Sequence, residues 1–171
     1  MSSTAGSSRP AAPVDPDVDL HAPAQQSQRA WDPAVLGAIA VGGVLGAEAR
    51  YGMSIWLTHQ PGEWPGSTWL VNTSGCFLIG VLMVVITELA SSPHRLVRPF
   101  LGVGILGGYT TFSTAMVDVQ QLAVAGREGL ALGYLAATVA AALVATFAGA
   151  TLARTTGAAW TRRRSAPEPR P

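Results

Sequence analysis

The chain has 171 residues, of which 49% are hydrophobic and only 12% are charged, and its formal net charge at pH 7 is +1. Soluble globular proteins carry about twice this share of charged residues, so the composition disfavours a soluble domain. The small net charge gives no electrostatic basis for binding nucleic acid. Cys76 is the only cysteine, which excludes a disulfide bond within the chain.

The two ends of the chain differ from its middle. Residues 1–33 are rich in Ser, Pro, Ala, Asp and Gln and show no apolar periodicity, so we expect a disordered N-terminal tail. Residues 154–171 are basic and rich in proline, and we expect a second tail there. The cluster Arg162, Arg163 and Arg164 is more typical of an anchor on the cytoplasmic side of a membrane span than of an RNA-binding tail.

Between the tails, residues 34–153 contain four apolar segments. Each is long enough to cross about 30 Å of hydrocarbon as a helix, and short connectors with turn-forming residues separate them. The pattern predicts an all-α membrane protein with four transmembrane helices. These segments cover residues 34–57, 68–89, 97–124 and 130–152.

Four crossings place both ends of the chain on one side of the membrane. Most arginines near the segment ends fall on that side, and Arg127 lies on the other. Basic residues favour the cytoplasmic face, so we expect both termini in the cytoplasm of a multi-pass protein of the cell membrane. The arginines on the expected cytoplasmic side are Arg29, Arg95, Arg98, Arg154 and Arg162 to Arg164.

The first segment carries a run of small residues at 42–47, which would let another helix approach closely. Glu48 and Arg50 follow two positions apart, so their side chains do not face each other on a helix. Arg50 lies near the expected helix end. It would either extend to the membrane surface or supply positive potential to the entrance of an anion path, and position alone does not decide between the two.

Polar residues recur at helical spacing in two other segments. Thr68 and Asn72 are four positions apart in the second segment, hence on one helix face. They would either join two helices by hydrogen bonding or line a polar track. Tyr134 and Thr138 have the same spacing in the fourth segment.

The third segment is rich in glycine and hydroxyl residues near its middle. Four glycines lie at positions 102, 104, 107 and 108, and residues 110–114 read Thr-Thr-Phe-Ser-Thr. This composition disfavours a continuous helix. A break would free backbone groups that need partners or ions within the membrane, as at transport sites. A packing kink is the alternative.

Signatures of catalysis are absent from the sequence. It has no His-Glu-x-x-His motif, no Gly-x-Ser-x-Gly motif and no phosphate-binding loop ending in Gly-Lys. The three histidines, His21, His59 and His94, all fall in the tails or connectors. We therefore predict that the protein is not an enzyme.

Taken together, these motifs resemble the Fluc (CrcB) family of fluoride channels over about residues 35–152. The family pattern Gly-Gly-x-x-Gly-x-x-x-Arg-Tyr appears at residues 42–51, and Gly-Thr-Leu-x-x-Asn appears as Ser67-Thr68-Trp69-Leu70-Val71-Asn72. The pattern Gly-Gly-x-Thr-Thr-Phe-Ser-Thr-Phe appears at residues 107–115 with one change, Ala115. Three motifs in order on matching helices make the resemblance specific.

The resemblance implies a passive fluoride channel that exports fluoride from the cytoplasm and protects against its toxicity. It implies an antiparallel dimer with two pores at the interface, and a third helix broken so that backbone carbonyls of Gly107 and Thr110 hold a structural sodium ion that is not transported. Asn72 and Phe112, with Ser113 and Thr114, match the pore. The remaining matches are the polar track Thr68, Tyr134 and Thr138, and the vestibule residue Arg50.

Ala115 departs from the family pattern, because alanine has no aromatic ring edge to offer an anion. The uneven arginine distribution also predicts one fixed orientation. We therefore expect either a homodimer in dual topology or a heterodimer with an oppositely oriented paralogue that supplies the missing phenylalanine. Two further alternatives are a different small transporter or scaffold without the pore, and a membrane-embedded enzyme.

Overall fold

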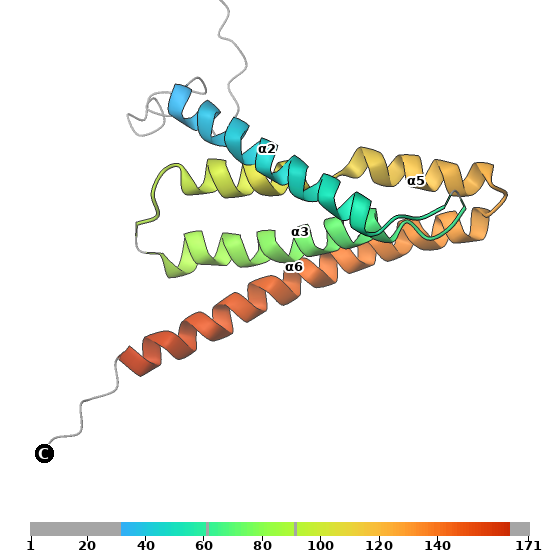
Figure 1. Ribbon diagram of the computed structural model, residues 1–171. Helices are drawn as coiled ribbons and strands as arrows, with labels where there is room; N and C mark the ends of the chain where they lie inside the picture. The colour runs from blue at the N-terminus through green and yellow to red at the C-terminus, as the bar shows by residue number, and fades with distance from the viewer. Residues whose placement is uncertain (1–31, 61, 91, 165–171) are drawn as a thin grey trace, which may run out of the picture. The chain divides into compact units, whose positions relative to one another are not determined.

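A computed structural model describes residues 32–60, 62–90 and 92–164 of the chain, and all regular secondary structure in these ranges is helical. The helices fall in one compact unit, Pro33–Pro171. They are α2 (Pro33–Trp56), α3 (Gly66–Val84), the π-helical η1 (Val85–Leu89) and η2 (Arg98–Leu106), α4 (Gly107–Tyr109), α5 (Phe112–Val124) and α6 (Glu128–Arg164) (Figure 1).

Four helical stretches are long and apolar enough to cross a membrane, which confirms the predicted number of membrane segments. They are Pro33–Trp56, Gly66–Leu89, Arg98–Val124 and Glu128–Ala158. The connectors between the first two and between the last two each turn through a glycine with positive φ, Gly62 at 88° and Gly126 at 73°, a conformation that other residues adopt at a cost.

The helix α6 continues well beyond the segment expected from the sequence. It ends at Arg164, so residues 154–164, assigned above to the C-terminal tail, extend the helix. The first proline after Glu128 is Pro167, so no residue before it breaks the hydrogen-bond pattern. The remainder of the predicted tail and nearly all of the predicted N-terminal tail lie outside the described residues.

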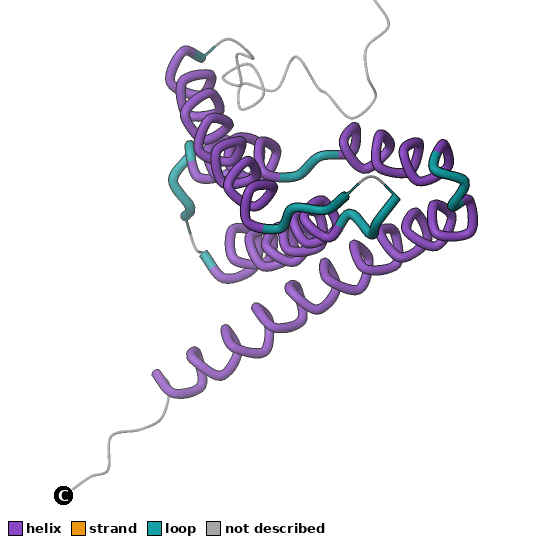
Figure 2. The backbone as a smooth tube through the Cα atoms, turned by 45° about the vertical axis from the view of Figure 1, so that its right-hand side comes forward, coloured by secondary structure: helices purple, strands orange, loops and turns teal. Residues whose placement is uncertain are grey.

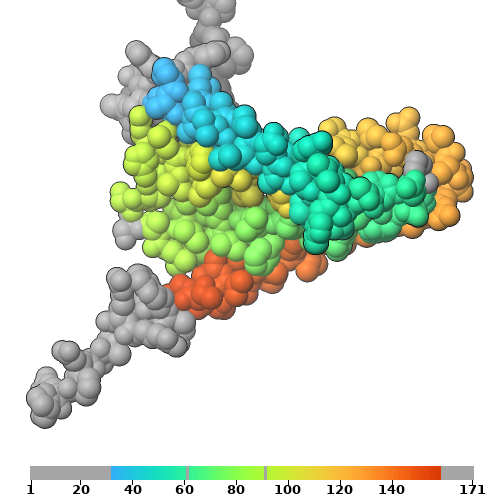
Figure 3. Space-filling model, in the orientation of Figure 1, coloured from blue at the N-terminus to red at the C-terminus, as the bar shows by residue number. Residues whose placement is uncertain are grey.

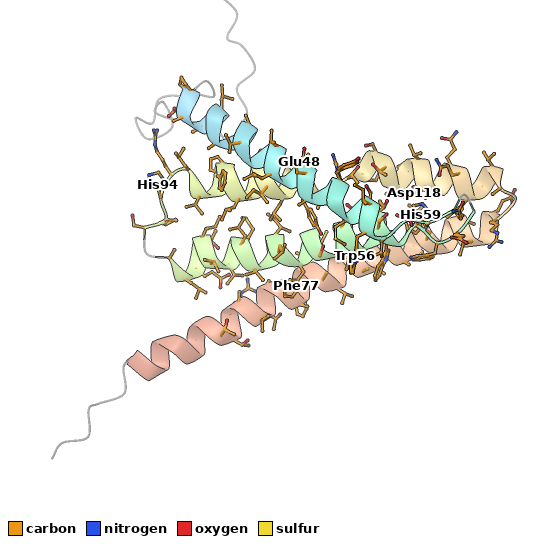
Figure 4. All side chains as sticks on the ribbon, in the orientation of Figure 1. Glu48, Trp56, His59, Phe77, His94 and Asp118 are labelled. Atoms are coloured by element: carbon orange, nitrogen blue, oxygen red, sulfur yellow. The ribbon has the colours of Figure 1, made fainter. Side chains whose placement is uncertain are left out.

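The helices α3 and α6 form one close pair (Figures 1 and 2). Two glycines make this approach possible. A Cβ atom on Gly80 would meet the backbone carbonyl oxygen of Thr146, and one on Gly149 would meet that of Phe77; Figure 4 labels Phe77 at this contact. The two backbones therefore pack directly against each other, as small residues allow in membrane helices.

The helix α2 packs against η2 and α4 in the same manner. A Cβ atom on Gly46 would meet the backbone of Ile105, and one on Gly108 would meet the backbone of Gly43. In Figure 3, α2 lies across the surface formed by the third membrane segment. The run of small residues in the first segment thus serves contact with the third.

The third segment changes conformation at residues 110 and 111, here called the 110–111 segment. Thr110 has φ −80° and ψ 157°, and Thr111 has φ −149° and ψ 121°. Both sets of angles are extended, whereas η2 and α4 precede them and α5 follows. Figure 2 shows the loop that joins the helical parts.

Candidate functional site

Asn72 on α3 forms a two-point contact with the 110–111 segment. Its Nδ2 atom donates to the backbone carbonyl oxygen of Thr111 at 2.8 Å, and its Oδ1 atom accepts from the backbone N–H of Thr111 at 2.8 Å. Both distances are typical of hydrogen bonds between amide groups. The side chain thus satisfies both backbone groups of Thr111 inside a membrane span, where water is not at hand to do so.

The side chain of Thr111 starts the next helix. Its Oγ1 atom accepts from the backbone N–H of Thr114 at 3.2 Å and donates to the Thr114 hydroxyl at 2.9 Å. A threonine hydroxyl that accepts from the third residue of a helix is an N-cap. Thr111 therefore fixes the start of α5 at Phe112.

These contacts leave two carbonyl groups without their helical donors. In a continuous helix, the N–H of Thr111 would bind the carbonyl of Gly107, and the N–H of Thr114 would bind that of Thr110. Here the first N–H binds Asn72 and the second binds Thr111 Oγ1. Carbonyl oxygens freed in this way are suitable ligands for a hard cation such as sodium, so these residues fit the predicted ion.

Arg50 approaches the same segment from α2. Its Nη1 atom donates to the carbonyl oxygen of Thr110 at 3.3 Å, and the side chain is half-buried. Glu48, two positions earlier, lies on the exposed side of the helix (Figure 4). The two side chains face different ways, as their spacing predicts.

A polar pocket of about 180 Å³ lies between Arg50 and the 110–111 segment. Its lining supplies one guanidinium group and five hydroxyl groups, and none of the seven described residues that line it is acidic. Such a lining offers hydrogen-bond donors and positive charge. The lining residues are Arg50, Ser54, Ser67, Thr68, Val71, Thr111 and Thr114.

Phe112 follows the 110–111 segment and is 78% exposed. Ser113, Thr114 and Gly107 are also exposed. Phe112 borders a second, largely apolar cavity of about 430 Å³, which Asn72, Gly107 and Thr110 also line. The predicted pore residues and the predicted carbonyl ligands therefore lie together around the 110–111 segment.

The predicted polar track lies between α3, α5 and α6. Tyr134 is fully buried, and its hydroxyl has no hydrogen-bond partner among the described residues. Thr68 and Thr138 lie beside the Tyr134 side chain. The Thr138 hydroxyl donates to the backbone carbonyl of Tyr134 at 2.8 Å. Thr68 also lines the polar pocket, so it connects the track with the Arg50 region.

Trp64 from the first connector packs against Tyr134 of this track. Its ring lies edge-on to the ring of Tyr134, with the centroids 5.2 Å apart, and edge-on to Trp69 at 6.4 Å. Pro65, the next residue, is fully buried. The first connector is thus packed onto the helices.

Asp118 on α5 belongs to the same polar group and was not identified from the sequence (Figure 4). It is only 6% exposed, and its Oδ2 atom has no hydrogen-bond partner in the described part of the chain. Spacing could have located it, because Ala115, Asp118 and Leu122 share one helix face and all three are buried. A buried acid in a membrane segment is a candidate functional residue.

Ala115 lies at the position where the resemblance predicts a second pore phenylalanine. It is 2% exposed and packs with Leu122, Ala131 and Tyr134 in the hydrophobic core. It also borders the cavity that Phe112 borders. The alanine therefore lies next to the predicted pore residues, where the small side chain leaves room.

Comparison with known proteins identifies relatives over most of the chain. Residues 37–150 match the family model described as CrcB-like protein, Camphor Resistance (CrcB). A Nocardia farcinica protein named Fluoride-specific ion channel FluC 2 is 56% identical over 112 residues, which is 66% of this chain and 79% of that protein. A Streptomyces coelicolor protein named Fluoride-specific ion channel FluC 1 is 50% identical over 143 residues, 84% of this chain and 86% of that protein.

A third relative, from Streptomyces avermitilis, is named Fluoride-specific ion channel FluC 2 and is 47% identical over 127 residues, 73% of this chain and 79% of that protein. All three relatives are named as ion channels and not as enzymes. The match covers all four membrane segments and the 110–111 segment. On this basis the chain belongs to the CrcB family.

Proposed function

We propose that this chain is a subunit of a fluoride-selective channel in the cell membrane, which lets fluoride leave the cytoplasm passively and so protects the cell from fluoride toxicity. The observation that carries the proposal is the polar pocket beside the 110–111 segment, which is lined by Arg50 and five hydroxyl groups. A pocket of donors without acids, placed within membrane-length helices, favours an anion over a cation.

The chemistry of the pocket suits a small, strongly hydrated anion. Fluoride must exchange water for other hydrogen-bond donors, and Thr, Ser and Tyr side chains supply them. The choice of fluoride rests on the relatives, which are named fluoride-specific ion channels. We assign the pore to Asn72, Phe112, Ser113 and Thr114, since these residues gather at the 110–111 segment.

Two further groups of residues complete the assignment. Arg50 would raise the local concentration of anions at the pore entrance. Thr68, Tyr134 and Thr138 would continue the path as a polar track, in which the buried Tyr134 hydroxyl lies beside the side chains of Thr68, Thr138 and Asp118. A Phe112 ring edge carries partial positive charge and can face an anion.

We propose that the third span acts as a broken helix with a structural sodium ion. Gly107 and Thr110 would hold the ion through their carbonyl oxygens, which lack helical donors. When bound, a cation would stabilise the Gly107 carbonyl, which lacks its helical donor, and would share the Thr110 carbonyl with Arg50. Two carbonyls from one subunit and two from a second would provide four oxygen ligands.

We propose a dimer, because the side of the third span that bears Gly107 and Phe112 is exposed, and the resemblance to the family implies that its two subunits are antiparallel. The second subunit is either another copy or an oppositely oriented paralogue. Streptomyces avermitilis has relatives numbered FluC 2 and FluC 3, which supports the occurrence of paralogues. A paralogue with phenylalanine at the position of Ala115 would restore the second ring.

The test of function is fluoride efflux from liposomes that contain the purified chain, measured with a fluoride electrode. From the functional dimer, whether homodimer or heterodimer, we expect rapid fluoride efflux, no chloride efflux, and a loss of at least about tenfold in Phe112→Ile, since the ring edge is removed from the pore. Phe147→Ile is the matched control, because Phe147 is similarly exposed, on α6. Equal efflux from both variants would refute the pore assignment.

The same efflux assay distinguishes a homodimer of this chain from a heterodimer with a paralogue. The chain alone should show weak efflux, and co-expression with a paralogue should raise it, if the heterodimer is the functional form. Strong efflux from the chain alone would reject the heterodimer and support dual topology.

A further inference from the structure

The amide of Asn72 interacts with a single residue through both of its ends. Its donor and its acceptor each bind a backbone group of Thr111 at 2.8 Å, although the two residues are 39 positions apart. A residue of a neighbouring antiparallel β-strand also binds both backbone groups of an extended residue, through its own N–H and C=O. The Asn72 side chain thus supplies the hydrogen bonds that a neighbouring strand would otherwise supply to Thr111.

This pairing determines what happens to the Gly107 carbonyl. The N–H of Thr111 has two possible acceptors, Gly107 O in a continuous helix or Asn72 Oδ1 as observed. It cannot serve both with good geometry, because residue 110 would need helical rather than extended angles. While Asn72 holds Thr111, the Gly107 carbonyl lacks a helical donor.

We propose that Asn72 is a positioning residue. It holds the 110–111 segment extended, keeps the Gly107 carbonyl free and fixes the direction in which Phe112 leaves the segment, and it acts on the permeating ion only through these groups. The proposal rests on the proposed function in one respect, namely that the 110–111 segment lies on the conduction path. In this proposal Asn72 makes no direct contact with the permeating ion.

Other side chains also hold the residues next to Thr111 in place. Ser74, two positions along α3, shares a hydrogen bond of 3.0 Å with the hydroxyl of Tyr109. Arg50 binds the Thr110 carbonyl from α2. Residues 109, 110 and 111 are therefore each held by a side chain from another helix, and only Thr111 is held at both of its backbone groups.

The first experiment measures hydrogen exchange at the Thr111 amide in detergent micelles. Asn72→Ala should raise the exchange rate by about tenfold or more, because a protecting hydrogen bond is lost. The matched control is Thr73→Ala, since the Thr73 hydroxyl is buried and has no hydrogen-bond partner among the described residues. Unchanged exchange in Asn72→Ala would overturn the proposal, and this result does not depend on fluoride conduction.

The second experiment asks whether Asn72 acts through Thr111 on conduction. Thr111 is replaced by its α-hydroxy acid, which turns the amide into an ester without the N–H, and the change is combined with Asn72→Ala. If both changes disturb the same contact, the double variant should lose little more fluoride efflux than the worse single variant. Circular dichroism and elution volume confirm that each variant is folded.

If Asn72 instead contacts fluoride directly, the double variant should lose more fluoride efflux than either single variant. Two independent losses of about tenfold would then multiply to about a hundredfold, and that outcome would overturn the proposal. If the wild-type chain and its paralogue complex carry no fluoride at all, the proposed function fails, whereas the exchange experiment still decides the role of Asn72.

Discussion

The two halves of α3 make different kinds of contact. Residues 66–75 carry side chains that bind backbone or hydroxyl groups of the third span, such as Asn72 to Thr111 and Ser74 to Tyr109. Residues 76–84 are apolar, and Gly80 lets the backbone of α6 approach directly. The first half contributes directional hydrogen bonds, and the second contributes close packing.

The comparison indicates which half stabilises the protein and which half positions the site. Hydrogen bonds between membrane helices contribute about 0.6 kcal/mol on average, whereas overpacking a tight contact costs about 1–3 kcal/mol or more. We therefore expect changes in the apolar half to affect folding most. Changes in the polar half should affect conduction before they affect folding.

The largest effect on stability is expected at Gly80. In Gly80→Val the new side chain would meet backbone atoms of Thr146 and Ala150, which cannot move aside as a flexible side chain would. We expect a loss of at least about 3 kcal/mol in the free energy of unfolding, measured by titration with sodium dodecyl sulfate. Gly133→Val on α6 is the control, because a Cβ atom there has nothing within 4 Å. Equal midpoints for the two variants would contradict the packing argument.

A smaller effect, on conduction alone, is expected at Arg50. Arg50→Gln removes the positive charge from the polar pocket and should lower fluoride efflux by about tenfold at low ionic strength, with an unchanged unfolding midpoint. Arg127→Gln is the control, because Arg127 is exposed in a connector. If both variants lose efflux equally, the effect belongs to overall charge and not to the pocket.

The smallest effect on stability is expected at Glu88, in η1, which continues α3. Arg154 on α6 binds both carboxylate oxygens of Glu88, with the shortest N–O distance 2.7 Å, but both side chains are about half exposed. Solvent and salt weaken such pairs. Glu88→Gln should therefore shift the unfolding midpoint slightly at low salt and not at high salt. A loss as large as that of Gly80→Val would show that this ion pair is not a minor contributor.

Some of these features could be predicted from sequence and others could not. The membrane segments follow from run length and composition, because any helix that crosses the bilayer must satisfy the same limits. The family was also recognisable, because its motifs are local. The contact between Asn72 and Thr111 joins residues 39 apart, and no pattern within either segment specifies a partner for the other.

Two residues show where the sequence carried a signal that was easy to overlook. Thr111 is followed at the third position by Thr114, a spacing compatible with a hydroxyl cap, yet only the observed bond shows that the cap starts a new helix. Asp118 lies near the end of an apolar run, beside Gln120 and Gln121. These polar neighbours suggest that Asp118 is exposed. Its burial becomes evident only from the helix face that it shares with Ala115 and Leu122, both of which are buried.

The N-cap at Thr111 has an electrostatic consequence. Because α5 begins at Phe112, within the Arg98–Val124 span, its backbone dipoles add up to about half a positive elementary charge at that end. This charge belongs to peptide groups, which neither gain nor lose protons across the physiological range. The amino end of α5 therefore favours an anion, whereas the carbonyl end of η2 and α4 directly before the 110–111 segment carries the opposite partial charge. This pair of opposite partial charges persists at any working pH and remains if every arginine is replaced.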